Sequence, residues 1–228
     1  MFSSKPDFAY ELIRANRRSL SLQVRNGQVI VRAPKRMRLG TIYEFLHKHH
    51  DWVEAQLANF AKRPPNPQGK EGDQVWFLGQ AYRLAYDKGI RDCRLAGNIM
   101  FVGGHALRYQ TPQSYKRRLR IWYRHTALAH LQERTAHFAA TMGVCPRSVV
   151  IRDYKARWGA CSSDNAITYN WRIILMPEYV IDYLVVHELA HIIQHNHSPA
   201  FWAEVAKILP NFRESRNFLK KQAENYIF

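Results

Sequence analysis

Residues 187–197 read HELAHIIQHNH and contain the most informative pattern of the C-terminal half. His187 and His191 are four residues apart, so on a helix both imidazoles lie on one face, with about 5–6 Å between their Cβ atoms. Glu188 stands beside the first histidine, where a carboxylate can accept a proton from metal-bound water. Two nitrogen ligands, a general base and a third ligand that leaves one position open are the parts of a zinc hydrolase. The stretch therefore predicts a helix with one Zn²⁺ site, His187 and His191 as ligands and Glu188 as catalytic base.

Three side chains downstream, His195, His197 and Glu204, compete for the position of third ligand. On one straight helix His187 and His195 would be about 12 Å apart along the axis, too far for two Zn–N bonds of about 2.0–2.1 Å to one ion. His197 can turn back to the ion if the helix ends before it, and it is nearer to the pair than Glu204. We therefore predict His197 as the third ligand, with Glu204 as the alternative. His195 is expected to face solvent or to form a hydrogen bond to a ligand without contacting the ion itself.

The sequence also contains the break that His197 requires. We expect the helix to run from about residue 178 to residue 194, and Asn196 tolerates the left-handed conformation that ends helices. Ser198 and the proline after it are typical of the N-cap and first position of a new helix, which we expect to run to about residue 209. His197 is thus predicted to lie in a tight turn between two helices.

An extended segment is expected before this helix. Residues 148–154 and 166–174 are predicted strands on either side of a loop rich in small residues, and we expect them to form a β-hairpin. The second strand is the predicted open edge, along which an extended polypeptide substrate would pair. Four side chains of this segment are predicted to line the substrate cleft: Arg157, Tyr169, Asn170 and Arg172.

The rest of the chain predicts an α+β protein in two parts. From Ser114 the apolar residues recur with a period of 3.6, which predicts a long helix that stops at Gly143. Residues 1–112 are expected to form a β-rich region with one helix at about 41–60 and a Pro- and Gly-rich linker at about 62–73. Residues 113–228 are expected to form the metal-binding domain. The predicted strands of the first part are 10–13, 20–24, 29–33, 74–78, 81–87, 93–96 and 98–102, with Asn26-Gly27 as a hairpin turn.

Composition narrows the class of protein further. The 228 residues carry 34 Lys and Arg against 18 Asp and Glu, a net charge of +16 that is spread along the chain. Such a surface attracts polyanions, so DNA or another nucleic acid is a possible partner. Three widely spaced cysteines predict neither a disulfide framework nor a cysteine zinc site and favour the reducing cytoplasm. No segment supplies the roughly 20 apolar residues that cross a bilayer, so no membrane association is expected.

Three motifs together resemble the YgjP-like metallopeptidases: RWGACSS at 157–163, NWRIILMP at 170–177 and HELAHIIQHNHSPAFW at 187–202. The resemblance extends over about residues 10–225. It implies a compact zincin-like domain related to the SprT-like and WLM-type domains, several of which cleave proteins attached to DNA. In the family's pattern His187, His191 and His197 match the metal positions and Glu188 the catalytic glutamate. Ala160 stands where that pattern often has serine, so a hydroxyl is not essential at this position.

Two functions of different classes follow from the sequence. The first is a zinc-dependent peptidase that hydrolyses peptide bonds through activated water, with Glu188 as general base and nucleic-acid-associated proteins as possible substrates. The second is a nucleic-acid-associated binding module with a structural or vestigial zinc site. Glu188 favours the first, because a structural site needs no base and usually closes its fourth position with a protein ligand.

Overall fold

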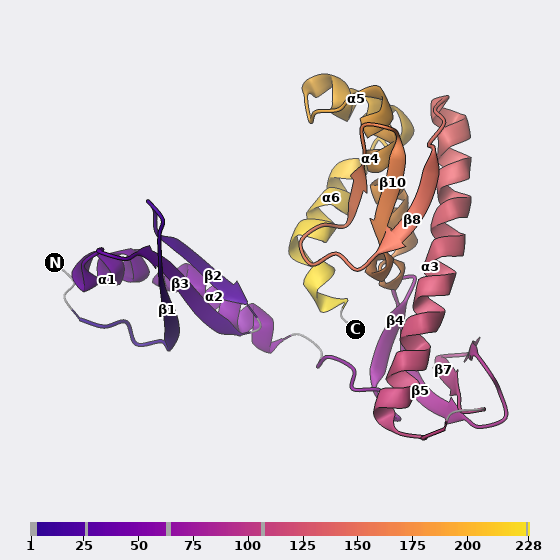
Figure 1. The fold of residues 1–228 in the computed structure, drawn as a ribbon, viewed down its shortest axis with the longest axis horizontal. Helices are drawn as coiled ribbons and strands as arrows, with labels where there is room; N and C mark the ends of the chain where they lie inside the picture. The colour runs from indigo at the N-terminus through magenta and orange to yellow at the C-terminus, as the bar shows by residue number, and fades with distance from the viewer. Residues whose placement is uncertain (1–3, 26, 63–64, 106–107, 227) are drawn as a thin grey trace. The chain divides into compact units, whose positions relative to one another are not determined.

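The computed structural model describes residues 4–25, 27–62, 65–105, 108–226 and 228. The chain divides into two compact units, residues 1–64 and residues 65–228 (Figure 1). The expected boundary at residue 112 differs from this division. The strands between residues 74 and 103 share a hydrophobic core with the long helix that follows them, so they belong to the second unit.

The first unit is a three-stranded sheet with two helices. Strand β3 (Gln28–Pro34) lies in the centre, parallel to β1 (Tyr10–Ala15) and antiparallel to β2 (Ser21–Arg25). The predicted hairpin between β2 and β3 is confirmed; Gly27 has the positive φ of 74° that the turn needs, and Asn26 lies outside the described residues. The small core contains Val31, Ala33, Ile42 and Leu46.

Two helices stand where one was expected at residues 41–60. They are α1 (Leu39–Lys48) and α2 (His50–Ala61), and the break falls at His49. The His49 ring Nδ1 lies 2.8 Å from the carbonyl oxygen of Phe45, and its backbone N–H donates to Leu46. The hydrogen bond from His49 to Leu46 spans three residues instead of the four of an α-helix, so it tightens the last turn and ends the first helix.

The second unit begins with a four-stranded sheet. Its strands are β4 (Gln74–Phe77), β5 (Gln80–Asp87), β6 (Cys93–Ala96) and β7 (Ile99–Gly103), in the order β4-β5-β7-β6. All four predicted strands are confirmed to within two residues. The Tyr123 hydroxyl donates to the carbonyl oxygen of Trp76 at 2.7 Å and ties this sheet to the helix that follows.

Helix α3 (Pro112–Met142) is the longest element described in the unit and confirms the predicted long helix. Thr111 caps its first turn, and Gly143 ends it in the left-handed conformation with φ of 66°. Arg118 lies near the positive end of the helix dipole, where a cation is unfavourable. Its guanidinium donates to three carbonyl oxygens, those of Arg91, Gly103 and His105, which offset this cost.

A second sheet of three strands follows, and its pairing differs from the expected hairpin. Strands β8 (Ser148–Arg152) and β10 (Ala166–Asn170) are parallel, and β9 (Gly159–Cys161) pairs antiparallel to β10. The order β8-β10-β9 places β10 in the centre and β9 at one edge, so the predicted edge strand was wrong. Parallel neighbours need a crossover, which the chain makes through the loop before β9.

The predicted strand at 166–174 is also shorter than expected. Asn170 ends β10, because its side-chain oxygen accepts from the backbone N–H of Arg172 and starts the 3₁₀ helix η1 (Trp171–Leu175). Trp171 is fully buried in the core. The segment therefore anchors the sheet to the helices behind it.

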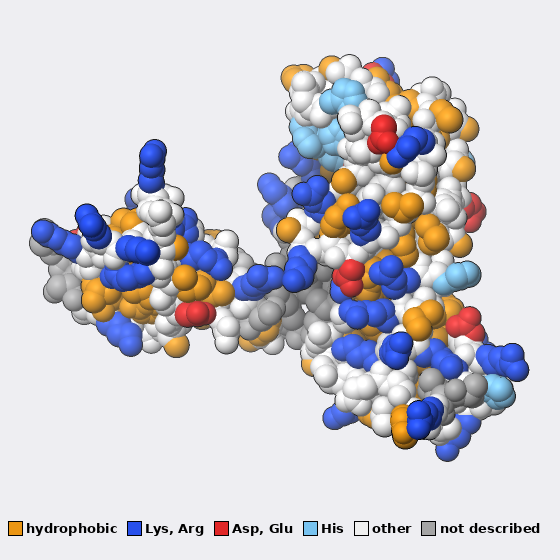
Figure 2. Space-filling model, in the orientation of Figure 1, with side chains coloured by type: hydrophobic (Ala, Val, Ile, Leu, Met, Phe, Trp, Pro, Cys, Tyr) orange, Lys and Arg blue, Asp and Glu red, His pale blue; other side chains and the backbone are white. Residues whose placement is uncertain are grey.

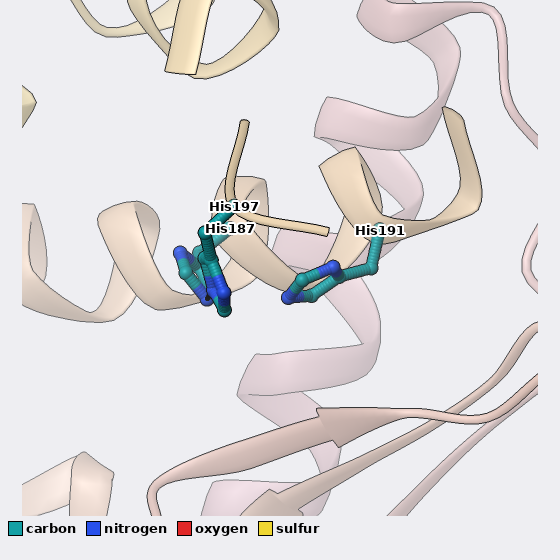
Figure 3. A group of neighbouring side chains, drawn as sticks. All are labelled: His187, His191 and His197. Carbon is teal, nitrogen blue, oxygen red and sulfur yellow. Dashed lines mark hydrogen bonds between the residues drawn. The ribbon is translucent and has the colours of Figure 1, made fainter. Parts of the chain in front are cut away.

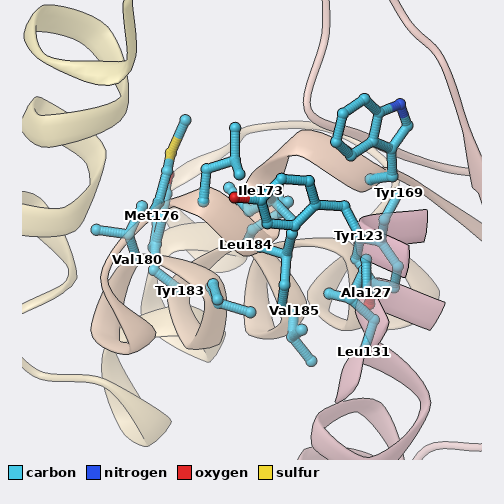
Figure 4. Packing of buried hydrophobic residues seen from close by; sticks show 14 of the residues in the cluster. Tyr123, Ala127, Leu131, Tyr169, Ile173, Met176, Val180, Tyr183, Leu184 and Val185 are labelled. Atoms are coloured by element: carbon cyan, nitrogen blue, oxygen red, sulfur yellow. The ribbon is translucent and has the colours of Figure 1, made fainter. Parts of the chain in front are cut away.

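Helix α4 (Glu178–Ile193) is packed between the other elements of the unit. It contacts α3, β9 and two helices that follow it in the chain, α5 (Pro199–Ile208) and α6 (Phe212–Lys221). A short 3₁₀ helix, η2 (Ala223–Asn225), comes after α6. Figure 4 shows Leu184 and Val185 of α4 in one buried cluster with Tyr123, Ala127 and Leu131 of α3. Arg134 of α3 and Asp182 of α4 form an ion pair at 2.6 Å. The enclosure confirms a helix that is apolar over most of its circumference.

Across the described ranges, every helix is too short or too polar to pass through a membrane.

Candidate metal centre

Three histidines meet at the end of α4. His187 and His191 lie one turn apart on this helix, and His197 follows in the connection to α5; the three rings lie next to one another (Figure 3). One ring nitrogen from each lies within 4.8 Å of the others, and the Nε2 atoms of His187 and His197 are 3.2 Å apart. Tetrahedral Zn–N bonds of about 2.0–2.1 Å place two nitrogens about 3.3 Å apart. The spacing of this pair therefore suits one shared ion.

The chain brings His197 back by leaving the helix early. Gln194 has extended dihedral angles, φ −135° and ψ 108°, and Ser198 caps α5 by accepting from the Phe201 N–H. Asn196 is not left-handed as expected; instead its side-chain oxygen accepts from the Ser198 N–H. The structure places His197, not the exposed His195, beside the other two histidines.

The donor set fits zinc. All three donors are imidazoles, and burial together with the neighbouring histidines lowers the pKa of His187 to about 3, which keeps its ring neutral as a ligand requires. The His191 Nδ1 lies 3.3 Å from the Gln194 carbonyl oxygen; as a donor there it leaves Nε2 for a metal. The alternative ligand, Glu204, forms an ion pair with Lys207 at 2.6 Å.

Glu188 is buried beside the histidines, on the side where β9 passes. Its side chain is held so close to this strand that a Cβ atom built on Gly159 would lie 2.3 Å from its Oε1 atom. Burial raises the pKa of Glu188 to about 8, and the charge of Arg157 opposes this rise. A carboxyl with a pKa near neutrality can both accept and donate a proton.

The family is decided by the sequence as a whole. A profile of the family described as YgjP-like, metallopeptidase domain, matches residues 18–222. The chain belongs to the YgjP-like metallopeptidase family. No curated protein matches the chain. Among solved structures, the crystal structure of the metallopeptidase zymogen of Pyrococcus abyssi abylysin is 28% identical, with a TM-score of 0.37, over 40% of this chain and 95% of that one.

The four residues predicted to line the substrate cleft differ in their exposure and in their partners. Arg157 is exposed and acts electrostatically on Glu188. Tyr169 is fully buried, with its hydroxyl 3.1 Å from that of Thr135. The Asn170 amide donates to the Tyr154 and Arg157 carbonyls, and Arg172 pairs with Asp153. Only Arg157 of this set has both exposure and an electrostatic effect on the site.

Four residues beside the site have no role among the predictions from sequence. Tyr183, Trp202 and Arg216 contact or act on the histidine rings, and Gly159 makes room for Glu188. The spacing of four between Tyr183 and His187 was a usable signal, because such residues share a helix face. Arg216 lies on another helix, and its position follows from tertiary packing alone.

Gly159 gives a direct test of the Glu188 geometry. In Gly159→Ala the new methyl group must displace the buried carboxyl, so we expect peptide hydrolysis by the proposed centre to fall by about 100-fold while zinc content stays unchanged. Activity and zinc content per chain are the measurements. Gly40→Ala is the matched control, since nothing lies within 4 Å of its Cβ position. Wild-type activity in Gly159→Ala would contradict the placement of Glu188.

The raised pKa of Glu188 also predicts how the metal-free protein responds to pH. The unfolded carboxyl ionises near its ordinary pKa of 4.5 and the folded one near 8, so the free energy of unfolding falls between about pH 5 and pH 8, by at most about 5 kcal/mol. Glu188→Gln removes this loss and should gain stability over wild type as the pH rises.

Urea unfolding in a chelator at pH 5 and pH 9 measures the difference. The depressed pKa of His187 makes stability fall as the pH drops from about 6.5 towards 3. Both proteins share this effect, so it cancels in the comparison. Parallel pH curves for the two proteins would show that Glu188 is not buried as described.

Proposed function

We propose that this protein is a zinc-dependent peptidase whose single ion is held by His187, His191 and His197. The observation that carries the proposal is the convergence of three imidazole nitrogens within 4.8 Å beside one buried carboxyl. Zinc bound there would lower the pKa of a coordinated water to about 7 and polarise the carbonyl of the scissile bond.

The side chains of the protein carry the proton transfers. Glu188 accepts a proton from the attacking water and delivers it to the leaving amine nitrogen. Burial raises the pKa of Glu188 in the metal-free protein, and the positive charge of a bound zinc ion would favour the ionised form that accepts the proton. The positive charge of Arg157 opposes this rise in the pKa of Glu188, because it favours the ionised form of the carboxyl.

Strand β9 is the element that supports binding of an extended substrate. It is an edge strand, it lies against α4, and Gly159 within it touches Glu188. A polypeptide that pairs with this edge would pass over the histidine cluster. The proposed substrate class is therefore an extended or unfolded segment of protein.

Charge favours substrates that are associated with nucleic acid. Residues 1–64 contain 12 Lys and Arg against 5 Asp and Glu, a net charge of +7, and residues 65–228 carry the remaining +9. Figure 2 shows Lys and Arg side chains spread over both units. Such a surface would bring the protein to DNA by a salt-dependent attraction.

One experiment tests activity and recruitment together. Zinc-loaded protein is incubated with casein, with a histone and with a histone bound to DNA, and new peptide termini are identified by mass spectrometry. We expect cleavage of casein and faster cleavage of the histone when DNA is present at low salt. Cleavage that DNA does not accelerate would remove the nucleic-acid part, and binding to DNA without any cleavage would favour the alternative, a binding module with a structural zinc ion.

A further inference from the structure

Arg216 lies beside the metal centre and has no part in the proposed chemistry so far. It is an exposed residue of α6, and its guanidinium carbon lies 4.4 Å from the ring centroid of Trp202. The Trp202 ring lies 5.6 Å from the ring of His197, at an interplanar angle of 27°, and 5.8 Å from the ring of His187. Arg216 is thus one side chain removed from two of the three histidines.

The Trp202 ring beneath this guanidinium is held by packing against α6. Phe212 lies one helical turn before Arg216 on α6, and its ring stacks on Trp202 at 5.3 Å with an interplanar angle of 10°. Both residues of α6 therefore contact the same indole, as residues four apart on one helix face do. A cation held over an aromatic ring is oriented before any ligand arrives.

Among the residues that the structure describes, the charge of Arg216 has no acidic partner. Within the described ranges, no carboxylate lies at ion-pair distance from its guanidinium, whereas Arg134, Arg147 and Arg172 are all paired. Its guanidinium nevertheless borders the site, because the Trp202 ring beneath it lies against the rings of His187 and His197. The cation that acts on Glu188 is a different one, Arg157.

We propose that Arg216 binds a carboxylate of the peptide substrate. The inference rests on the proposed peptidase function and adds a specificity to it. A guanidinium presents two parallel N–H groups that match the two oxygens of a carboxylate. Since Arg216 reaches the histidines only through Trp202, the group it binds belongs to a residue near the scissile bond rather than to the carbonyl under attack. The two sources of such a group are an acidic side chain and the free C-terminus.

Binding to an inactive protein separates these sources. Zinc-loaded Glu188→Gln is titrated with three N-acetylated alanine peptides of equal length: one with a free C-terminus, its C-terminal amide, and an amide with one alanine replaced by glutamate. Tryptophan fluorescence and calorimetry report the Kd. Adding Arg216→Gln should weaken binding of a carboxylate peptide about 10- to 100-fold and leave the plain amide unchanged. The peptide that loses affinity identifies the source.

Two variants control for the fold and for charge. Arg213→Gln removes another exposed arginine of α6, whose guanidinium lies over Phe212, and should leave all three Kd values unchanged. Arg216→Lys keeps the charge without the fork and should give an intermediate loss. Equal effects of Arg216→Gln on the amide and on the carboxylate peptides, or no effect on any, would overturn the proposal.

Hydrolysis by the wild-type protein is scored separately on the same peptides. Cleavage together with Kd values that do not depend on Arg216 overturns this inference and leaves the peptidase proposal standing. Carboxylate binding that depends on Arg216 without cleavage of any peptide or protein supports the binding site and overturns the peptidase proposal.

Discussion

Glu188→Gln is expected to retain zinc and to lose peptide hydrolysis by about 1,000-fold. Glutamine has nearly the same shape as glutamate, so it fits the space beside Gly159, but it cannot accept a proton from water. General acid–base catalysis by one side chain contributes about 10²- to 10⁴-fold, and the loss should fall in kcat. The measurement is kcat and KM on a casein-derived peptide, with zinc content per chain determined on the same preparation.

The control for this variant is a glutamate on the same helix. Glu178→Gln changes an exposed residue in the first turn of α4, far along the helix from the histidines, and should leave kcat within about twofold. Full activity of Glu188→Gln would remove Glu188 as the base. Loss of zinc in this variant would instead give Glu188 a structural role in the metal site.

His197→Ala is the second change with a large expected effect. It removes one of the three nitrogens that lie within 4.8 Å of one another, and the remaining pair on α4 cannot enclose an ion alone. Mutation of a residue that only orients a ligand typically lowers metal affinity 10- to 100-fold. Because His197 is itself a proposed ligand, we expect zinc affinity to fall by at least about 100-fold. Competition with a fluorescent zinc chelator measures the affinity.

His195→Ala is the matched control, two residues away in the same connection. Its ring is exposed and lies outside the cluster, so zinc affinity should stay within about threefold of wild type. If the two variants exchanged these results, His195 would be the ligand, and the turn that leads into α5 would have to adopt another conformation when metal binds.

The arrangement of the three histidines could be predicted from local rules. The spacing of His187 and His191 fixes their common helix face, and a helix of ordinary rise cannot also bring His195 to the same ion. Ser198 and its proline start α5 as expected. The end of α4 differs from the prediction, because Gln194 is extended and Asn196 is not left-handed.

Strand pairing could not be read from the same local rules. The sequence of β8 and β10 fits a hairpin as well as a parallel pair, and the short strand β9 has only three residues. What decides between these is the packing of the sheet on α3 and α4, where Gly159 must lie against Glu188. The division of the chain has a similar cause, because the strands before residue 112 bury their side chains against α3.

X-ray absorption at the zinc edge of the loaded protein, together with the zinc content per chain, tests whether the three histidines hold one ion. We expect one zinc ion with three imidazole nitrogens at about 2.0–2.1 Å and an oxygen atom as the remaining ligand. A sulfur ligand at about 2.3 Å, for which Cys161 near Glu188 would be the candidate, or a protein that takes up no zinc, would contradict this expectation.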